Sequence, residues 1–206
     1  MRKSIVILFI AFASCFGVNK KRAQEVRCDE LPINVQKICK AAVERTKADV
    51  VYNGAYVSID YPNGDVPASQ GVCTDVVIRT YRKALNLDFQ QLIHEDMKKA
   101  FDKYPSKQLW GLEKPDANID HRRTQNIECF LKRKNAQLPI TKNAKDYKPG
   151  DLVFWDGIGF GHVGIVVNIY TEDSIPMVVH NIGGGPELED FLFGAEISGH
   201  YRWFGE

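Results

Sequence analysis

Three residues carry side chains that together could cleave an amide bond: Cys73, His162 and His180. A cysteine attacks a carbonyl carbon as the thiolate, so it needs a neighbouring base or a helix N-terminus that favours the ionised sulfur. Cys73 follows Gly71 and opens a run of apolar residues with helical spacing, which places it in the first turn of a predicted helix. The sequence therefore predicts a nucleophile at Cys73 that folding must pair with a distant histidine.

His162 is the histidine that we expect to act as the base. It opens an apolar run at 163–167, directly after a turn rich in glycine that lets another segment approach closely. His180 ends the next predicted strand, where its ring could bond the first imidazole and fix its tautomer. A nucleophile, a base and an orienting group make up a catalytic triad. Asn181 is the alternative orienting residue, because a register shift of one residue would exchange the two side chains.

Other polar residues are candidates for substrate binding or for stabilising an oxyanion. Tyr61 either helps to form the oxyanion site or packs as an ordinary aromatic residue. Asp75 precedes Arg79 by four residues, so it either takes part in the site or forms a helical ion pair. The string 120–123 either lines the cleft, where arginine can bind a carboxylate through two hydrogen bonds, or is a solvated loop. Its members are Asp120, His121, Arg122 and Arg123.

The elements that must position these residues are helical in the first part of the chain and extended in the second. Apolar residues with helical spacing predict helices at 31–50, 72–85, 88–101 and 126–135, with a long loop at 104–125. Runs rich in β-branched and aromatic residues predict strands at 151–155, 162–170, 177–181 and 201–204, and a short extended segment at 56–61. Helices followed by strands predict an α+β fold, with N-terminal helices packed on a small antiparallel sheet.

The N-terminus has the pattern of an export signal. Two basic residues precede an apolar run at 5–12, and small residues follow it. The run is shorter than the ~20 residues that cross a bilayer. We therefore expect residues 1–23 to be a removed signal and residues 24–206 to form a single domain in the periplasm or cell envelope. A stretch ending at Cys15 also resembles a bacterial lipoprotein cleavage box, so a lipid anchor at Cys15 is an alternative to ordinary cleavage.

Four cysteines follow the predicted lipidation site. In an oxidising compartment we expect Cys28 and Cys39 to pair if any pair forms, because they lie close in sequence and outside the other motifs. Cys129 lies in a helical pattern, which favours a buried and inert thiol. The spacings match no zinc motif, so we expect no metal and no cofactor. We interpret His94 and His200 as structural.

Composition places the chain among ordinary globular proteins. Hydrophobic residues make up 44% and charged residues 26% of the 206 residues, and the formal net charge is +1. That balance lacks the basic footprint of a protein that binds DNA or RNA, so we expect no nucleic-acid partner. We also expect a monomer.

The motifs around the candidate triad resemble those of the NlpC-type cell-wall cysteine hydrolases, over residues 50–185. The matching strings are 71–75, 149–155, 161–166 and 179–181. The resemblance implies a papain-like fold in which Cys73 is the nucleophile, His162 the general base and His180 the orienting residue, with peptidoglycan stem peptides as substrate. The sequence departs from that family at 74–75, where Thr-Asp replaces the usual Ser-Gly, and in a long insertion before the sheet.

Further strings are similar to a bacterial family known only as a domain of unknown function (family 1287). They lie at 61–67, 118–123, 180–183 and 199–202, so this similarity spans nearly the whole mature chain. It implies kinship and leaves the substrate open.

The sequence thus predicts an exported cysteine hydrolase that cleaves an amide bond in peptidoglycan, either inside the stem peptide or between sugar and peptide. We expect N–H groups at the helix start, including that of Cys73, to stabilise the oxyanion. A cell-wall binding module without activity is an alternative, although the intact candidate triad argues against it. A thiol acyltransferase is a further alternative, because water and another acceptor compete only at the second step.

Overall fold

The chain combines helices with an antiparallel sheet in a computed structural model that describes residues 24–25 and 30–205. This confirms the predicted α+β class. The predicted signal at 1–23, the lipidation site Cys15 and the pairing residue Cys28 lie outside the described residues. Within those described ranges, every helix is too short or too polar to serve as a membrane span.

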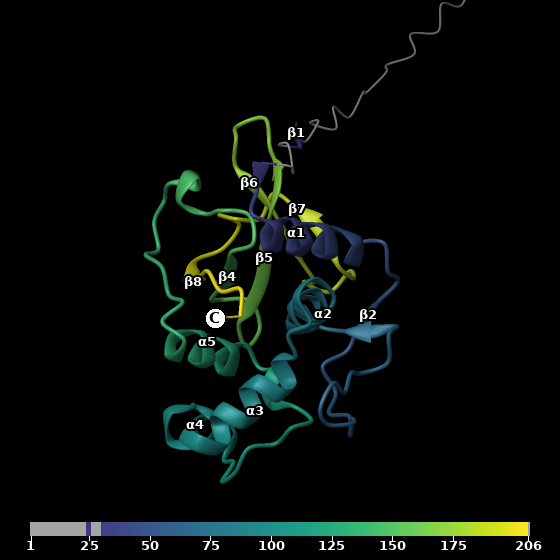
Figure 1. Cartoon of the computed structure of the whole chain (residues 1–206), viewed down its shortest axis with the longest axis vertical. Helices are drawn as coiled ribbons and strands as arrows, with labels where there is room; N and C mark the ends of the chain where they lie inside the picture. Colours follow the sequence, from purple (N-terminus) through teal and green to yellow (C-terminus); the bar gives the residue numbers. More distant parts are fainter. Residues whose placement is uncertain (1–23, 26–29, 206) are drawn as a thin grey trace, which may run out of the picture.

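An antiparallel sheet with strand order β7-β6-β5-β4-β8 forms the centre of the molecule (Figure 1). Its strands are β4 (Leu152–Trp155), β5 (His162–Tyr170), β6 (Pro176–His180), β7 (Glu187–Glu189) and β8 (Ile197–Tyr201), and β1 (Gln24–Glu25) pairs with the far end of β5. The predictions for β4, β5 and β6 are confirmed to within one residue. The last strand lies earlier than the predicted 201–204, and β7 was not predicted, because three residues are too few for a period-two pattern.

In the part of the chain that the structure describes, five α-helices precede strands β4 to β8. They are α1 (Ile33–Arg45), α2 (Cys73–Leu85), α3 (Phe89–Ala100), α4 (Ser106–Trp110) and α5 (Thr124–Arg133). Helices α1 and α2 pack on each other and against β5, whereas α3, α4 and α5 gather at one end of the molecule (Figure 1). The segment 104–125, expected as a loop, contains α4 and the 3-10 helix η3 (Asp120–Arg122). Both are too short to produce a periodic pattern.

A small parallel ladder links the region before α2 to its first turn. It consists of β2 (Val51–Tyr52) and β3 (Gln70–Gly71), with Tyr52 opposite Gly71. The strand therefore lies earlier than the extended segment expected at 56–61. Because β3 ends two residues before Cys73, this ladder holds Tyr52 beside the start of α2.

The two faces of the sheet bury different layers, since successive strand residues point to opposite sides. The face toward the helices carries Leu152, Phe154, Val163, Ile165 and Val179, in one core cluster with Cys73. The other face carries Val153, Trp155, Val166 and Val178, in a smaller cluster. His162 pairs with Trp155 across β4 and β5 and so belongs to this second face.

Candidate functional site

Cys73 is the first residue of α2, and its sulfur meets the end of β5. The side chain is only 4% exposed. Burial raises the pKa of the thiol to about 11, although N–H groups of Val163, Thr74 and Cys73 itself hydrogen-bond the sulfur and act in the opposite direction. The resting thiol is therefore protonated at neutral pH. Since Val163 directly follows His162, the same contact brings Cys73 to the end of the strand where His162 lies.

The candidate base and the candidate orienting residue are in direct contact. His162 Nε2 lies 2.7 Å from His180 Nδ1. The pairing of Ile165 with Val179 places His180 beside Gly164, on the same face of the sheet as His162. A Cβ atom at Gly164 would lie 3.1 Å from His180 Cβ and 2.5 Å from a Val178 methyl group. Glycine at this position thus makes the room in which the two rings meet.

The second nitrogen of His180 meets a carboxylate. His180 Nε2 lies 2.8 Å from Glu189 Oε2, on the neighbouring strand β7. A continuous row of hydrogen bonds therefore runs from His162 through His180 to Glu189. No local pattern indicated Glu189, because β7 is short and the pairing depends on its register with β6.

Both histidine rings are enclosed by aromatic side chains. The rings of Trp155 and His162 are 5.7 Å apart, and those of Phe191 and His180 are 4.6 Å apart. Burial, together with a smaller effect of charge on His180, lowers the pKa of His162 to about 4. Burial also lowers the pKa of His180, against an opposing effect of Glu189. Both imidazoles are therefore neutral at pH 7, and a neutral imidazole can accept a proton.

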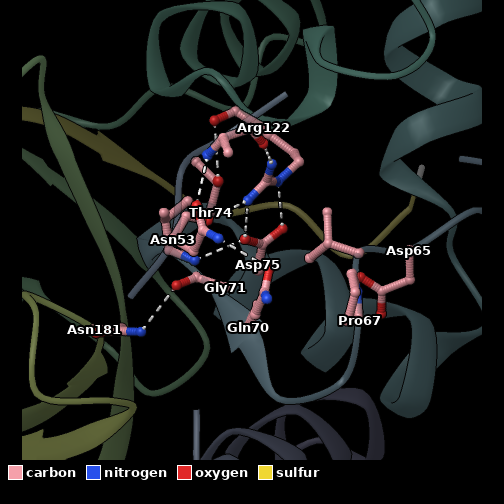
Figure 2. A network of polar contacts seen from close by, with 12 residues as sticks. Asn53, Asp65, Pro67, Gln70, Gly71, Thr74, Asp75, Arg122 and Asn181 are labelled. Carbon is pink, nitrogen blue, oxygen red and sulfur yellow. Dashed lines mark hydrogen bonds and ion pairs between the residues drawn. The ribbon is translucent and has the colours of Figure 1, made fainter. Parts of the chain in front are cut away.

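A buried ion pair fixes the first turn of α2 (Figure 2). Arg122 donates from Nε and Nη2 to the two carboxylate oxygens of Asp75, at 3.0 and 2.9 Å, and both side chains are at most 3% exposed. The same guanidinium donates to the carbonyl oxygens of Asn53 and Ala55, and the Thr74 hydroxyl donates to the Arg122 carbonyl. Arg122 thus ties the segment after β2 to the start of α2.

The prediction of a helical ion pair between Asp75 and Arg79 is wrong. Arg79 instead pairs with Asp65 at 2.8 Å. Asp75 Oδ2 also accepts the N–H of Val72 at 2.7 Å, so the carboxylate caps the helix from within. A carboxylate that already serves an arginine and a helix start is a structural group, and its bonds position Cys73.

The string 120–123 is not a solvated loop. Asp120, His121 and Arg122 are buried in η3. Burial raises the pKa of Asp120 to about 6 and lowers that of His121 to about 4. The Arg123 guanidinium lies 3.9 Å from the centre of the Trp110 ring. Each of the three guanidinium nitrogens of Arg122 already donates to a protein acceptor, which argues against the predicted binding of a substrate carboxylate there.

Tyr61 packs against α3, and Tyr52 lies beside Cys73 instead. The Tyr61 hydroxyl lies 3.4 Å from Glu95, and its ring is 5.0 Å from that of His94. This agrees with the packing alternative. The Tyr52 pKa is raised by partial burial and by nearby charge on Cys73, and 44% of the residue is exposed. Tyr52 therefore keeps its proton beside the sulfur, in the place predicted for Tyr61. A two-residue parallel ladder offers no sequence signal for it.

Asn181 shapes the loop that follows β6. Its Oδ1 accepts the N–H groups of Gly183 and Gly185 at 3.0 and 3.2 Å, and its amide points toward the carbonyl of Gly71 at 3.5 Å (Figure 2). His180, not Asn181, makes the contact with His162. The register thus favours His180 as the orienting residue.

A second histidine and carboxylate cluster lies elsewhere in the sheet. His200 Nε2 lies 2.8 Å from Asp151, and His200 Nδ1 lies 3.0 Å from the carbonyl oxygen of Pro139. Arg202 donates to both oxygens of the same Asp151. This agrees with the structural interpretation of His200.

Cys129 is only half-buried, and its thiol donates to the Lys103 carbonyl. No group of three or more metal-binding side chains occurs among the residues that the structure describes.

Two comparisons with known proteins place the chain among relatives. A family model described as "Domain of unknown function (DUF1287)" matches residues 39–203. A protein of Escherichia coli (strain K12) named "Uncharacterized protein YijF" is 45% identical over 168 residues, which cover 81% of this chain and 80% of that protein. Neither description states an activity.

Proposed function

The chain belongs to the DUF1287 family, whose description states no activity, and we propose from its site that it is a cysteine hydrolase. The proposal rests on one arrangement. The sulfur of Cys73 contacts the N–H of Val163, one residue from His162, and Nε2 of His162 bonds His180. Nδ1 is then the nitrogen of His162 that remains for the thiol.

The resting pair is neutral, so attack and proton transfer occur together. The thiol proton of Cys73 moves to Nδ1 of His162 while the sulfur forms a bond to the amide carbonyl carbon. The C–N bond of the tetrahedral intermediate then breaks, and the same proton passes to the leaving amine. Water attacks the resulting thioester, gives a proton to His162, and releases the carboxylic acid and the thiol. Burial of both groups, which keeps them neutral, supports this order of events.

Two kinds of donor are available for the oxyanion. N–H groups of the first turn of α2 already face the sulfur of Cys73, and an oxyanion would form next to that atom. The Tyr52 hydroxyl is the second kind, since it stays protonated near Cys73 and is partly open to solvent. The pair formed by Asp75 and Arg122 holds both donors in place, because it joins the start of α2 to the segment after Tyr52.

For the substrate we propose an amide bond of peptidoglycan, within the stem peptide or between sugar and peptide. The support is the resemblance of residues 50–185 to the NlpC-type cell-wall hydrolases, which also supports a papain-like fold, together with the export pattern at 1–23. We accordingly place the protein in the periplasm or cell envelope. The departures from that family leave both classes of bond as candidates, and the products of the reaction distinguish them.

The test is mass spectrometry of purified muropeptides incubated with the wild-type protein, with Cys73→Ala and with Cys129→Ala. Cys129 is the matched control, because its thiol donates to the carbonyl oxygen of Lys103 and lies on α5, outside the candidate triad. We expect cleavage by the wild type and by Cys129→Ala, with loss of activity in Cys73→Ala. The masses of the products identify the bond.

Three other results would contradict the proposal. Cleavage that survives in Cys73→Ala excludes the thiol as nucleophile. Binding of muropeptides by both proteins without any cleavage favours a cell-wall binding module. Transfer of the acyl group to an added amine, at a rate that exceeds hydrolysis, favours a thiol acyltransferase.

A further inference from the structure

We infer that Glu189 is a positioning residue that selects the tautomer of His180 and, through it, the tautomer of His162. The inference rests on the proposed function and deepens it, because it says why His162 presents an unprotonated nitrogen to Cys73. Glu189 lies on β7 and makes its contact with His180 at 2.8 Å. It does not belong to the predicted triad.

The chain of reasoning begins at the carboxylate. An ionised carboxylate only accepts hydrogen bonds, so its contact with His180 Nε2 requires a proton on that nitrogen. A neutral imidazole carries one ring proton, which leaves His180 Nδ1 as an acceptor. Glu189 therefore turns His180 into a ring that donates on one side and accepts on the other.

The same logic passes to the next ring. His180 Nδ1 lies 2.7 Å from His162 Nε2, and an acceptor at that distance requires a proton on His162 Nε2. Nδ1 of neutral His162 is then unprotonated. This is the nitrogen that can take the thiol proton of Cys73, so the base is prepared before substrate arrives.

The opposite arrangement would disable the base. If His180 carried its proton on Nδ1, that group would donate to His162 Nε2, and the proton of His162 would move to Nδ1. A protonated Nδ1 cannot accept from a thiol. Without an acceptor at position 189, both arrangements satisfy the bond between the two rings. Glu187, opposite His180 on β7, acts on that ring by its charge, whereas the hydrogen bond to Nε2 comes from Glu189.

The test is the ring nitrogen spectrum of the protein with 15N-labelled histidine, which reports which nitrogen of each ring carries the proton. The full chain has only five histidines, so His162→Gln and His180→Gln assign the two signals. The variant is Glu189→Ala, and the matched control is Glu187→Ala, which removes an exposed carboxylate from the same strand. Muropeptide cleavage is measured on the same samples.

In the wild type we expect a proton on Nε2 of both rings. Glu189→Ala is expected to give a mixture of tautomers, or Nδ1–H, at both rings, and to lower kcat about tenfold with KM unchanged. Glu187→Ala is expected to match the wild type in spectrum and rate. Because Glu189 is 39% exposed, its removal leaves the fold intact, which the remaining histidine signals verify.

The inference is overturned if wild-type His162 carries its proton on Nδ1, or if both rings keep their wild-type tautomers in Glu189→Ala. Both results are read without substrate. A wild-type protein that shows the expected tautomers and cleaves no muropeptide would therefore refute the proposed substrate and leave the role of Glu189 standing.

Discussion

Two histidines in this molecule place Nε2 at 2.8 Å from a carboxylate, and they differ in what their other nitrogen meets. Nδ1 of His200 faces the carbonyl oxygen of Pro139, which can only accept a hydrogen bond. Nδ1 of His180 faces the ring of His162, which can donate or accept.

The difference separates a structural cluster from the row of hydrogen bonds that runs from Glu189 through His180 to His162. This row holds the proposed base and is called the reactive row below. Around His200 the bonds run to a buried carboxylate and a backbone carbonyl, and Arg202 donates to both oxygens of the same Asp151. The row from Glu189 ends instead on His162, the residue before Val163, whose N–H contacts the Cys73 sulfur. A histidine paired with a carboxylate is therefore not by itself a sign of catalysis, and the partner of the second nitrogen decides its role.

The largest effect is expected from removing one ring from each cluster. His162→Ala should lower kcat/KM for muropeptides by about 10³–10⁴-fold, because it deletes the proposed general base, and should also lower the free energy of unfolding by about 1–3 kcal/mol, because buried His180 loses its partner. His200→Ala should leave the activity of the folded protein within about twofold but lower the free energy of unfolding by about 1–3 kcal/mol, since Asp151 and the Pro139 carbonyl lose a buried donor. Steady-state kinetics and urea unfolding of both variants check this. Equal losses of activity in His162→Ala and His200→Ala would contradict the assignment of one histidine to catalysis and the other to structure.

The carboxylates of Asp151 and Glu189 should likewise differ in how much they contribute to the free energy of unfolding. Asp151 is fully buried, so Asp151→Ala leaves His200 and Arg202 without their acceptor and should cost about 3–5 kcal/mol of unfolding free energy. Glu189 is 39% exposed, and Glu189→Ala should cost less than about 1 kcal/mol. Urea unfolding at pH 7 measures both. A cost at Glu189 as large as that at Asp151 would make Glu189 a structural residue.

Sequence patterns predicted the reactive row only in part, for a physical reason. Cys73, His162 and His180 begin or end long elements with clear periodicity, and those elements are confirmed. Glu189 lies on a three-residue strand, and its contact depends on a pairing register that no local pattern encodes.

The prediction that residues 120–123 form an exposed loop was wrong for a different reason. Polarity suggested exposure for Asp120, His121 and Arg122, yet these side chains are buried. A charged residue can be buried when its partners come from distant segments, and Asp75 and the carbonyls after β2 supply those of Arg122. Such a partner set becomes visible only once the chain is folded. The same holds for Tyr52, which a two-residue ladder brings to the site.

A smaller effect on kcat should distinguish Tyr52 from Tyr61 and show whether the Tyr52 hydroxyl stabilises the oxyanion. Tyr52→Phe removes a protonated hydroxyl near Cys73 and should lower kcat by about 100-fold if that hydroxyl stabilises the oxyanion. Tyr61→Phe removes a hydroxyl that lies 3.4 Å from Glu95 and should change kcat less than about twofold. Steady-state kinetics with one muropeptide compare them. A rate for Tyr52→Phe equal to that of the wild type would leave the N–H groups of α2 as the oxyanion donors.

The smallest effect is expected from acid, and it tests the neutral state of the reactive row. Burial lowers the pKa of His162 to about 4, so the ring stays neutral, and able to accept the thiol proton, as pH falls from 7 to 6. Burial raises the pKa of Cys73 to about 11, so the thiol does not ionise in this window either. kcat/KM should therefore change by less than about 1.2-fold, whereas a base with the ordinary histidine pKa of ~6.5 would lose roughly threefold. A threefold loss of kcat/KM between pH 7 and pH 6 would mean that His162 gains a proton as an exposed imidazole does. Burial would then not be what keeps the ring of His162 neutral in the reactive row.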